Sequence, residues 1–263
     1  MKKILPLVTT ILLAGMVLHA QQKKHSKFFA ELSGGPSFAL GKFAGKTYNG
    51  FFDTDPSGKA KTGLAAQFSL GYYINKSVGV LLLPGYSVHK QDHTGYENYT
   101  KTTLSGSSPG SSIANLDVHT NKWKLTKLMA GGFFVTPLTE SSTFSLITKI
   151  TAGVCKTAIP GYKFTYTITS ASSPSLPGYA MSEMSDIKLP WTFCYQVSVG
   201  VKYKLKDNLH VLFDINSFNS TPSKEWTFFL TPPISSGPPV TEKKTVKYKL
   251  VELNTLVGIG FDF

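Results

Sequence analysis

The sequence predicts an all-β fold, an eight-stranded antiparallel up-and-down β-barrel that crosses a membrane with its strands. Three observations lead to this prediction. Eight segments alternate apolar and polar residues with a period of two, the connections between them are short and long in turn, and aromatic residues gather near both ends of the segments. Alternation puts every second side chain on the same face of a strand. A barrel with lipid outside and polar side chains inside repeats this pattern in every strand.

The N-terminal segment predicts export. Residues 1–20 have a basic start, an apolar stretch and the small residue Ala20 at the end, which is the pattern of a cleaved secretory signal peptide. We expect residues 21–26 to be a short N-terminal tail and residues 27–263 to be the barrel domain. Past the signal, no run approaches the ~18 apolar residues that a spanning helix needs.

The charge of the chain argues against one class of partner. The formal net charge is +12, and all 27 basic residues are lysine. Proteins that read nucleic acid usually use the bidentate guanidinium group of arginine. We therefore expect no nucleic-acid partner. An excess of lysine is typical of a solvated surface, or of one that faces lipid headgroups or anionic polysaccharide.

The first four alternating runs cover residues 27–38, 63–74, 78–88 and 122–135. In the third run, Leu81 and Leu83 interrupt the polar face. The fourth run is the least regular, because Lys127 lies on its apolar face. If that face meets lipid, either a bulge shifts the phase of the strand or Lys127 lies near the membrane interface. The other residues of this face are Trp123, Leu125, Met129, Phe133 and Val135.

The last four runs cover residues 144–154, 191–203, 209–216 and 244–263. The sixth run has the cleanest alternation. In the eighth, the upper part, with Val246, Tyr248 and Leu250, is out of phase with the lower part, which predicts a second bulge. The expected lipid-facing residues of the sixth run are Trp191, Phe193, Tyr195, Val197, Val199, Val201 and Tyr203.

The lengths of the connections indicate the orientation of the barrel. Three connections are short, at residues 75–77, around 136–142 and at 206–208. The other four are long and rich in Gly, Ser, Thr and Pro, at roughly 40–61, 90–121, 157–188 and 218–243. Short and long alternate without exception. Outer-membrane barrels have short periplasmic turns and long external loops, so we expect both termini on the periplasmic side.

Aromatic residues predict two girdles. Phe28 and Tyr203 are among those at the expected periplasmic ends, and Phe38 and Trp191 are among those at the other ends. At ~3.3 Å a residue and a tilt of ~40°, the strand from Phe28 to Phe38 rises about 25 Å, which is the height of the apolar band of such barrels.

In architecture, in "HAQQ" after the signal and in the terminal "GFDF", the chain resembles the eight-stranded outer-membrane barrels of Bacteroidota, the PorT-like and OmpX-like set. The resemblance covers nearly the whole mature chain. It implies that Ile259, Phe261 and Phe263 form the signal that the barrel-assembly machinery reads.

Several polar residues are expected inside the barrel, because a barrel of eight strands is filled by its own side chains. A mutually satisfying hydrogen-bonded network is the main expectation, and a path for protons or small ions is the alternative. The expected network consists of Glu31, Gln67, Lys149, Gln196, Lys202, Asp214, Glu252 and Asp262, with Asn254 beside them.

Two further groups of residues suggest chemistry. Cys155 and Cys194 lie on consecutive strands with the inward set, and an exported protein could bridge them by a disulfide. His89, His93 and His119 flank the longest loop and are weak candidates for metal ligands. We otherwise expect no metal and no cofactor.

The sequence favours a non-enzymatic outer-membrane barrel of a Gram-negative bacterium, with a structural or surface-interaction role and no wide pore. Expected partners are outer-membrane lipid, the assembly machinery during biogenesis, and an unidentified surface partner or polysaccharide. One alternative is an accessory barrel of a secretion or transport system. Two others are a lipid-modifying enzyme, for which His210 and Asp214 share an inward face, and a soluble periplasmic ligand-binding barrel.

Overall fold

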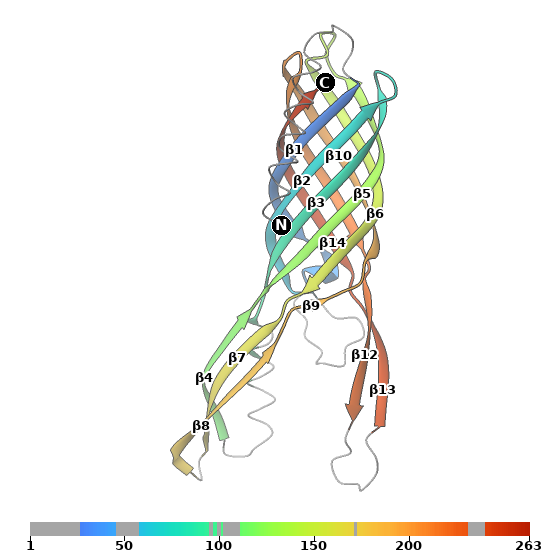
Figure 1. Ribbon diagram of the computed structural model, residues 1–263. Coiled ribbons are helices and arrows are strands. Elements are labelled where there is room, and N and C mark those ends of the chain that lie inside the picture. The colour runs from blue at the N-terminus through green and yellow to red at the C-terminus, as the bar shows by residue number, and fades with distance from the viewer. Residues whose placement is uncertain are drawn as a thin grey trace, which may run out of the picture.

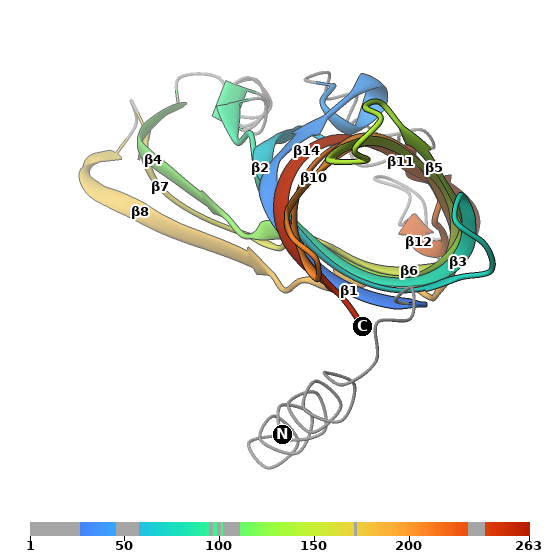
Figure 2. The ribbon, with the colours of Figure 1, turned by 90° about the horizontal axis from the view of Figure 1, so that it is seen from above.

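The computed structural model describes residues 27–45, 58–94, 97–98, 101, 111–170, 173–230 and 240–263. Eight strands pair antiparallel with their neighbours, in the order β10-β11-β14-β1-β2-β3-β5-β6, and β6 pairs with β10 to close the sheet (Figures 1 and 2). The predicted eight-stranded barrel is confirmed. Its strands are β1 (Phe28–Ala39), β2 (Ala60–Tyr73), β3 (Val78–Gln91), β5 (Lys122–Pro137), β6 (Phe144–Ile159), β10 (Thr192–Lys206), β11 (Leu209–Ser220) and β14 (Leu250–Asp262).

The two ends of the barrel differ. At one end, here called the turn end, residues 74–77, 138–143 and 207–208 connect the strands, and the C-terminus lies there too (Figure 1). At the other end, here called the loop end, the four long connections meet. The alternation of short and long connections that the sequence predicts is therefore present. None of the helices within the described residues is long and apolar enough to cross a membrane.

The long connections contain strands that the sequence reasoning missed, apart from residues 244–247, which belong to the eighth predicted run. A three-stranded sheet is formed by β4 (Ser111–Thr120), β7 (Tyr162–Ser170) and β8 (Ser173–Met184), and β12 (Ser223–Leu230) pairs with β13 (Val240–Lys247). Both sheets project from the loop end (Figure 1). These segments were expected to be irregular, because Gly, Ser and Pro surround them. Their Thr and aromatic residues favour strands.

Two small elements complete the loop end. The 3₁₀ helix η1 (Gly41–Phe43) follows β1, and the two-residue strand β9 (Ile187–Lys188) pairs with β6. The bulge expected in the last run is instead a break, since β13 ends at Lys247 and β14 begins at Leu250. The chain thus passes from the projecting hairpin into the barrel wall through two residues that belong to no strand.

The barrel wall is apolar outside and largely polar inside. Its outward side chains include leucines, isoleucines and valines from all eight strands, and Leu64 and Ile150 are each 64% exposed. Single exposed apolar side chains are common on soluble proteins, but an exposed apolar surface that continues around the whole wall is not. Representative members of this belt are Leu32, Leu64, Leu82, Leu128, Ile150, Val199, Phe213 and Val257.

Strand β5 corrects one prediction. Its register with β3 and β6 is unbroken, so the expected bulge is absent from this strand. Trp123, Leu125, Lys127 and Met129 are all buried, whereas Leu128 is 47% exposed. The face of β5 that carries these four buried side chains, apolar except for Lys127, therefore points into the barrel. The sequence argument failed because it took the more apolar face to be the lipid face, but near the loop end the interior is apolar as well.

A lysine on the outward wall should be costly in the middle of the barrel and tolerated at its end. Val199 lies near the middle of β10 and is 48% exposed, and Leu205 lies at the turn end and is 49% exposed. For a barrel in a bilayer, we expect Val199→Lys to lower the free energy of unfolding by about 2–4 kcal/mol and Leu205→Lys by at most about 1 kcal/mol. Urea unfolding in lipid vesicles measures both. Equal costs would contradict the placement of β10 across a bilayer.

Candidate functional site

A charged network fills the barrel near the turn end. Glu31 lies at its centre, with Oε2 3.1 Å from Lys149 Nζ and Oε1 3.1 Å from His210 Nε2. The other ring nitrogen of His210 is 3.1 Å from Asp262 Oδ2, and Lys202 Nζ donates to Asp262 Oδ1 over 2.9 Å. The network ends on Asp214, whose Oδ2 is 3.5 Å from Lys149 Nζ.

The backbone makes room for this network. At Gly260 of β14, an added Cβ would lie 2.3 Å from His210 Nε2 and 2.7 Å from Glu31 Cγ. Any larger residue would separate the histidine from the carboxylate. The glycines of the terminal run thus serve the interior as well as the strand.

Uncharged amides occupy the middle of the barrel. Gln67 Nε2 donates to Gln196 Oε1 over 3.0 Å, which joins β2 to β10 across the interior. Asn254 Nδ2 donates to Asn216 Oδ1 over 2.7 Å between the neighbouring strands β14 and β11. Polar groups removed from water need such partners.

A second charged network lies toward the loop end. Glu252 is fully buried and contacts Lys127, His89 and Ser87 together. Lys127 Nζ donates to Oε2, Ser87 Oγ donates to Oε1 over 2.7 Å, and His89 Nε2 is 2.9 Å from Oε1. The Lys127 ammonium also lies 3.9 Å from the ring centroid of Phe218. One carboxylate therefore contacts a lysine and a histidine in the barrel interior.

Aromatic clusters cover both networks. At the loop end, Phe43 of η1 is fully buried, with its ring 5.1 Å from that of His89 and 5.3 Å from that of Trp123. Trp123 Nε1 donates to the Gly58 carbonyl over 2.8 Å, which ties the connection between β1 and β2 across the mouth. At the turn end, Phe29, Tyr73 and Phe133 pack together with centroids 5.0–5.4 Å apart.

Sequence reasoning missed this cover at the loop end. Phe43 lies in a connection where alternation gives no information, and nothing in its neighbours marks it as buried. His89 was expected in a loop but is buried inside, because β3 continues to Gln91, beyond the expected end at residue 88. A strand longer by three residues, of which His89 and Gln91 point inward, accounts for this error.

The two cysteines do not form the disulfide that was suggested. Cys155 and Cys194 are both buried and free. In the register of β6 and β10, Cys155 pairs with Thr192 and Cys194 pairs with Gly153, so the two cysteines are two residues out of register. Cys155 Sγ donates to Ser220 Oγ over 3.2 Å. In this structure they are packed thiols of the barrel interior.

The histidine candidates for a metal site are separate from one another in their contacts. His89 contacts Glu252, His93 Nε2 is 3.3 Å from Glu97, and His119 Nε2 is 2.9 Å from Asp117. Over the described parts of the chain, no group of three or more His, Cys, Asp or Glu side chains could hold a metal ion.

His210 and Asp214, considered for a lipid-modifying enzyme, belong to the turn-end network. His210 is fully buried and contacts Glu31 and Asp262, while Asp214 contacts Lys149. Both nitrogens of the imidazole are therefore occupied by carboxylates. The arrangement pairs His210 with carboxylates and places its side chain out of reach of the outer surface of the wall.

The residues of the expected assembly signal lie on the closing strand. Ile259 and Phe261 of β14 point outward, 46% and 38% exposed. Phe263 exchanges two backbone hydrogen bonds with Phe28, of 2.8 and 2.9 Å, and stacks on its ring with centroids 6.4 Å apart. Their recognition by the assembly machinery stays a prediction.

Other predictions concern residues outside the described part. The predicted signal peptide and N-terminal tail, residues 1–26, lie outside it.

Asp186 fastens the base of the three-stranded sheet. Its carboxylate accepts hydrogen bonds from the Gly161 amide over 2.9 Å, Asn121 Nδ2 over 2.8 Å and Lys124 Nζ over 3.1 Å. Burial would raise the pKa of this carboxyl, but the hydrogen bonds from Gly161, Asn121 and Lys124 outweigh it and lower the pKa below 3.8. Asp186 thereby joins three connections that leave the barrel wall.

The sheet should loosen when Asp186 loses its charge. A lowered folded-state pKa stabilises the folded form above the unfolded-state pKa, and this contribution disappears as the pH falls through the folded-state value. We expect Asp186→Asn to cost about 1 kcal/mol locally, because the amide oxygen can still accept from Gly161. Hydrogen exchange should quicken in β7 and β8 and stay unchanged in β11. Unchanged exchange in β7 and β8 would show that Asp186 does not hold the sheet.

Comparison with known proteins gives similarity at the level of fold. No protein-family model matches the chain, and no curated protein matches it. Among solved structures, Neisserial surface protein A is 11% identical with a TM-score of 0.42, over 92% of this chain and 100% of that one. A major outer membrane protein from Thermus thermophilus is 10% identical with a TM-score of 0.44, over 91% and 100%. Outer membrane protein W of E. coli is 15% identical with a TM-score of 0.34, over 92% and 100%. The fold described above rests on the strand register of this chain itself.

Proposed function

We propose that this chain is an integral outer-membrane barrel with a structural or surface-interaction role. The observation that carries this proposal is the inversion of the wall, which is apolar toward the outside and holds buried, paired charges inside. In water such an apolar belt would be unstable, whereas in a bilayer it is required. A soluble ligand-binding barrel would have the opposite arrangement.

The interior favours an anchor over a wide channel. Two charged networks and two aromatic clusters occupy the barrel from the turn end to the loop end, and Phe43 of η1 is buried against His89 and Trp123 at the loop end. Barrels of eight strands have interiors just wide enough for their own side chains. We infer that the barrel serves to fix the projecting sheets at a membrane.

The projecting sheets are the parts suited to contact a surface partner. Within the described residues, β4 and β8 each pair only with β7, and β12 and β13 pair only with each other. Each therefore has one edge whose backbone groups are open to another strand, which is a common mode of peptide and protein recognition. The resemblance to Bacteroidota PorT-like barrels, with export by a signal peptide at residues 1–20, is part of this proposal.

Epitope insertion tests the orientation. A tag near Ser107, Ser172 or Ser236, in the long connections, should be reached by antibody on whole cells. A tag at Lys76 or Asp207, in the short turns, should be reached only after permeabilisation. Labelling at Lys76 on intact cells would overturn the orientation, and release of the protein by osmotic shock without detergent would overturn the membrane assignment.

A further inference from the structure

At the loop end, strands of the barrel wall diverge next to β11. Strands β10 and β11 form their last pair at Cys194 and Ser220, and β11 and β14 form theirs at Ser220 and Leu250. Beyond these pairs, β11 and β14 lead toward the projecting hairpin, where Tyr248 N donates to the Pro222 carbonyl over 2.9 Å. The segment that precedes β10 turns the other way, toward β6. There, Leu189 N donates to the Thr157 carbonyl over 2.8 Å. The strands therefore diverge.

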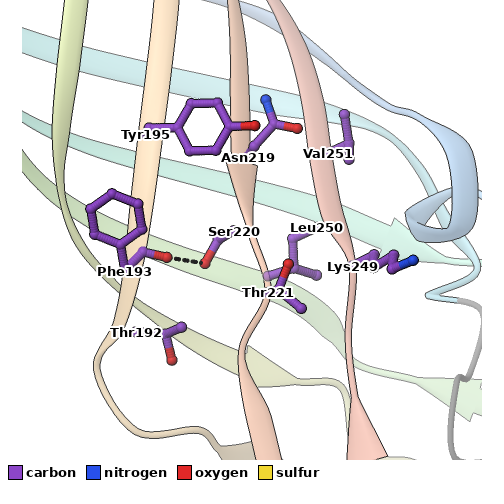
Figure 3. Close-up of a pocket in the computed structure, with 9 residues that line it drawn as sticks. All are labelled: Thr192, Phe193, Tyr195, Asn219, Ser220, Thr221, Lys249, Leu250 and Val251. Carbon is purple, nitrogen blue, oxygen red and sulfur yellow. Dashed lines mark hydrogen bonds between the residues drawn. The ribbon is translucent and has the colours of Figure 1, made fainter.

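A groove of about 350 Å³ lies at this divergence, on the outer surface of the wall (Figure 3). Phe193 and Tyr195 lie on one side of it, 64% and 47% exposed, and Lys249 lies on the other side. Ser220 lies between them, and its hydroxyl donates to the Phe193 carbonyl over 2.9 Å. The remaining lining residues are Thr192, Asn219, Thr221, Leu250 and Val251.

The lining combines an apolar side with a cationic one. Thr221 and Lys249 are exposed, and the Tyr195 hydroxyl points toward Asn219 along the wall (Figure 3). A lysine ammonium with nearby hydroxyls matches a phosphate, which lysine binds as a point charge. The exposed rings of Phe193 and Tyr195 and the half-buried Val251 beside it match an acyl chain.

The position of the groove agrees with a lipid headgroup. Trp191 immediately precedes β10 and is 53% exposed, and Lys156 Nζ lies 5.9 Å from its ring centroid. Tryptophan and lysine at the end of a membrane strand are typical of the interface between hydrocarbon and water. The groove lies at this level, beside β10.

We propose that this groove binds the phosphate headgroup of an outer-leaflet membrane lipid. Lys249 neutralises the phosphate, Thr221 lines the groove beside it, and the first part of the acyl chain lies against Phe193 and Val251. The inference rests on the proposed membrane location. It adds that the barrel selects one class of lipid at a defined place on its wall.

Lipid retention tests the groove. The full mature chain is placed in nanodiscs of phosphatidylcholine with a minor share of phosphatidic acid, and native mass spectrometry measures the phosphatidic acid that stays bound after release. We expect selective retention by the wild type. Lys249→Gln should weaken it about fivefold, as expected for the loss of one lysine near the membrane surface.

Lys90→Gln is the matched control. Lys90 is an exposed lysine at the loop end of β3, away from the groove, and loses the same charge. It should retain phosphatidic acid like the wild type. Equal loss in Lys90→Gln and Lys249→Gln, or no loss in Lys249→Gln, would overturn the groove as a site.

Flotation with the same lipids as vesicles separates this inference from the proposed function. A wild type that floats with the vesicles but shows no selective retention overturns the groove alone. A wild type that does not float overturns the membrane location, and the groove with it.

Discussion

Replacement of Glu252 by alanine should destabilise the barrel by about 3–5 kcal/mol, the usual cost of removing one partner from a buried ion pair. The Glu252 carboxylate is fully buried and holds Lys127, whose side chain is 1% exposed, together with His89. Without it, the Lys127 ammonium would remain in the interior beside the Phe218 ring. Urea unfolding measures this loss of stability. The readout is the fraction of protein that keeps the gel mobility of the folded barrel at each urea concentration.

Two controls decide whether burial is the cause. Glu225→Ala removes a carboxylate from the exposed pair with Lys243, 3.2 Å apart, and should cost at most about 1 kcal/mol. The double variant Glu252→Leu with Lys127→Met removes both buried charges and should recover most of the stability lost by Glu252→Ala. If Glu252→Ala were as stable as the wild type, Lys127 would have to be hydrated or otherwise paired. The conclusion that the barrel interior is closed to water would then be wrong.

The barrel could be predicted from the sequence because lipid imposes a simple rule on its wall. Every outward position must be apolar over the height of the bilayer, so alternation is visible in Val197, Val199 and their neighbours of β10 without any knowledge of packing. The interior obeys no such rule. On β5 it accepts Trp123 and Leu125 beside Lys127, and only the partners on β14 and β11 make that mixture stable.

The interior contacts could be predicted only in part. Alternation identified Glu31 and Glu252 as inward residues, but it could not pair them, since the partner of each lies on a distant strand. Glu31 contacts Lys149, which is 118 residues away, and Glu252 contacts Lys127, which is 125 residues away. Such pairs depend on the stagger of the strands around the barrel, which is a property of the whole sheet.

Removal of residues 255–263 should abolish the barrel, whereas removal of Phe263 alone should leave it folded. The longer deletion takes away the stretch of β14 that pairs with residues 29–34 of β1 and residues 209–215 of β11. Their backbone groups would then face lipid without partners, which no membrane protein tolerates. Deletion of Phe263 removes two backbone hydrogen bonds to Phe28 and one ring contact, all at the edge of the wall.

Comparison of folding in cells and in vitro then isolates the role of Phe263 in assembly. Refolded into detergent or vesicles, the chain without Phe263 should reach nearly the wild-type yield, because little packing is lost. In cells its yield should fall, since the terminal aromatic that the assembly machinery is expected to read is missing and the unassembled chain is exposed to periplasmic proteases. Heat-modifiable gel mobility of membrane fractions measures both variants. Equal yields in cells would refute the assembly signal, and a membrane-inserted band from the nine-residue truncation would show that β14 does not close the barrel.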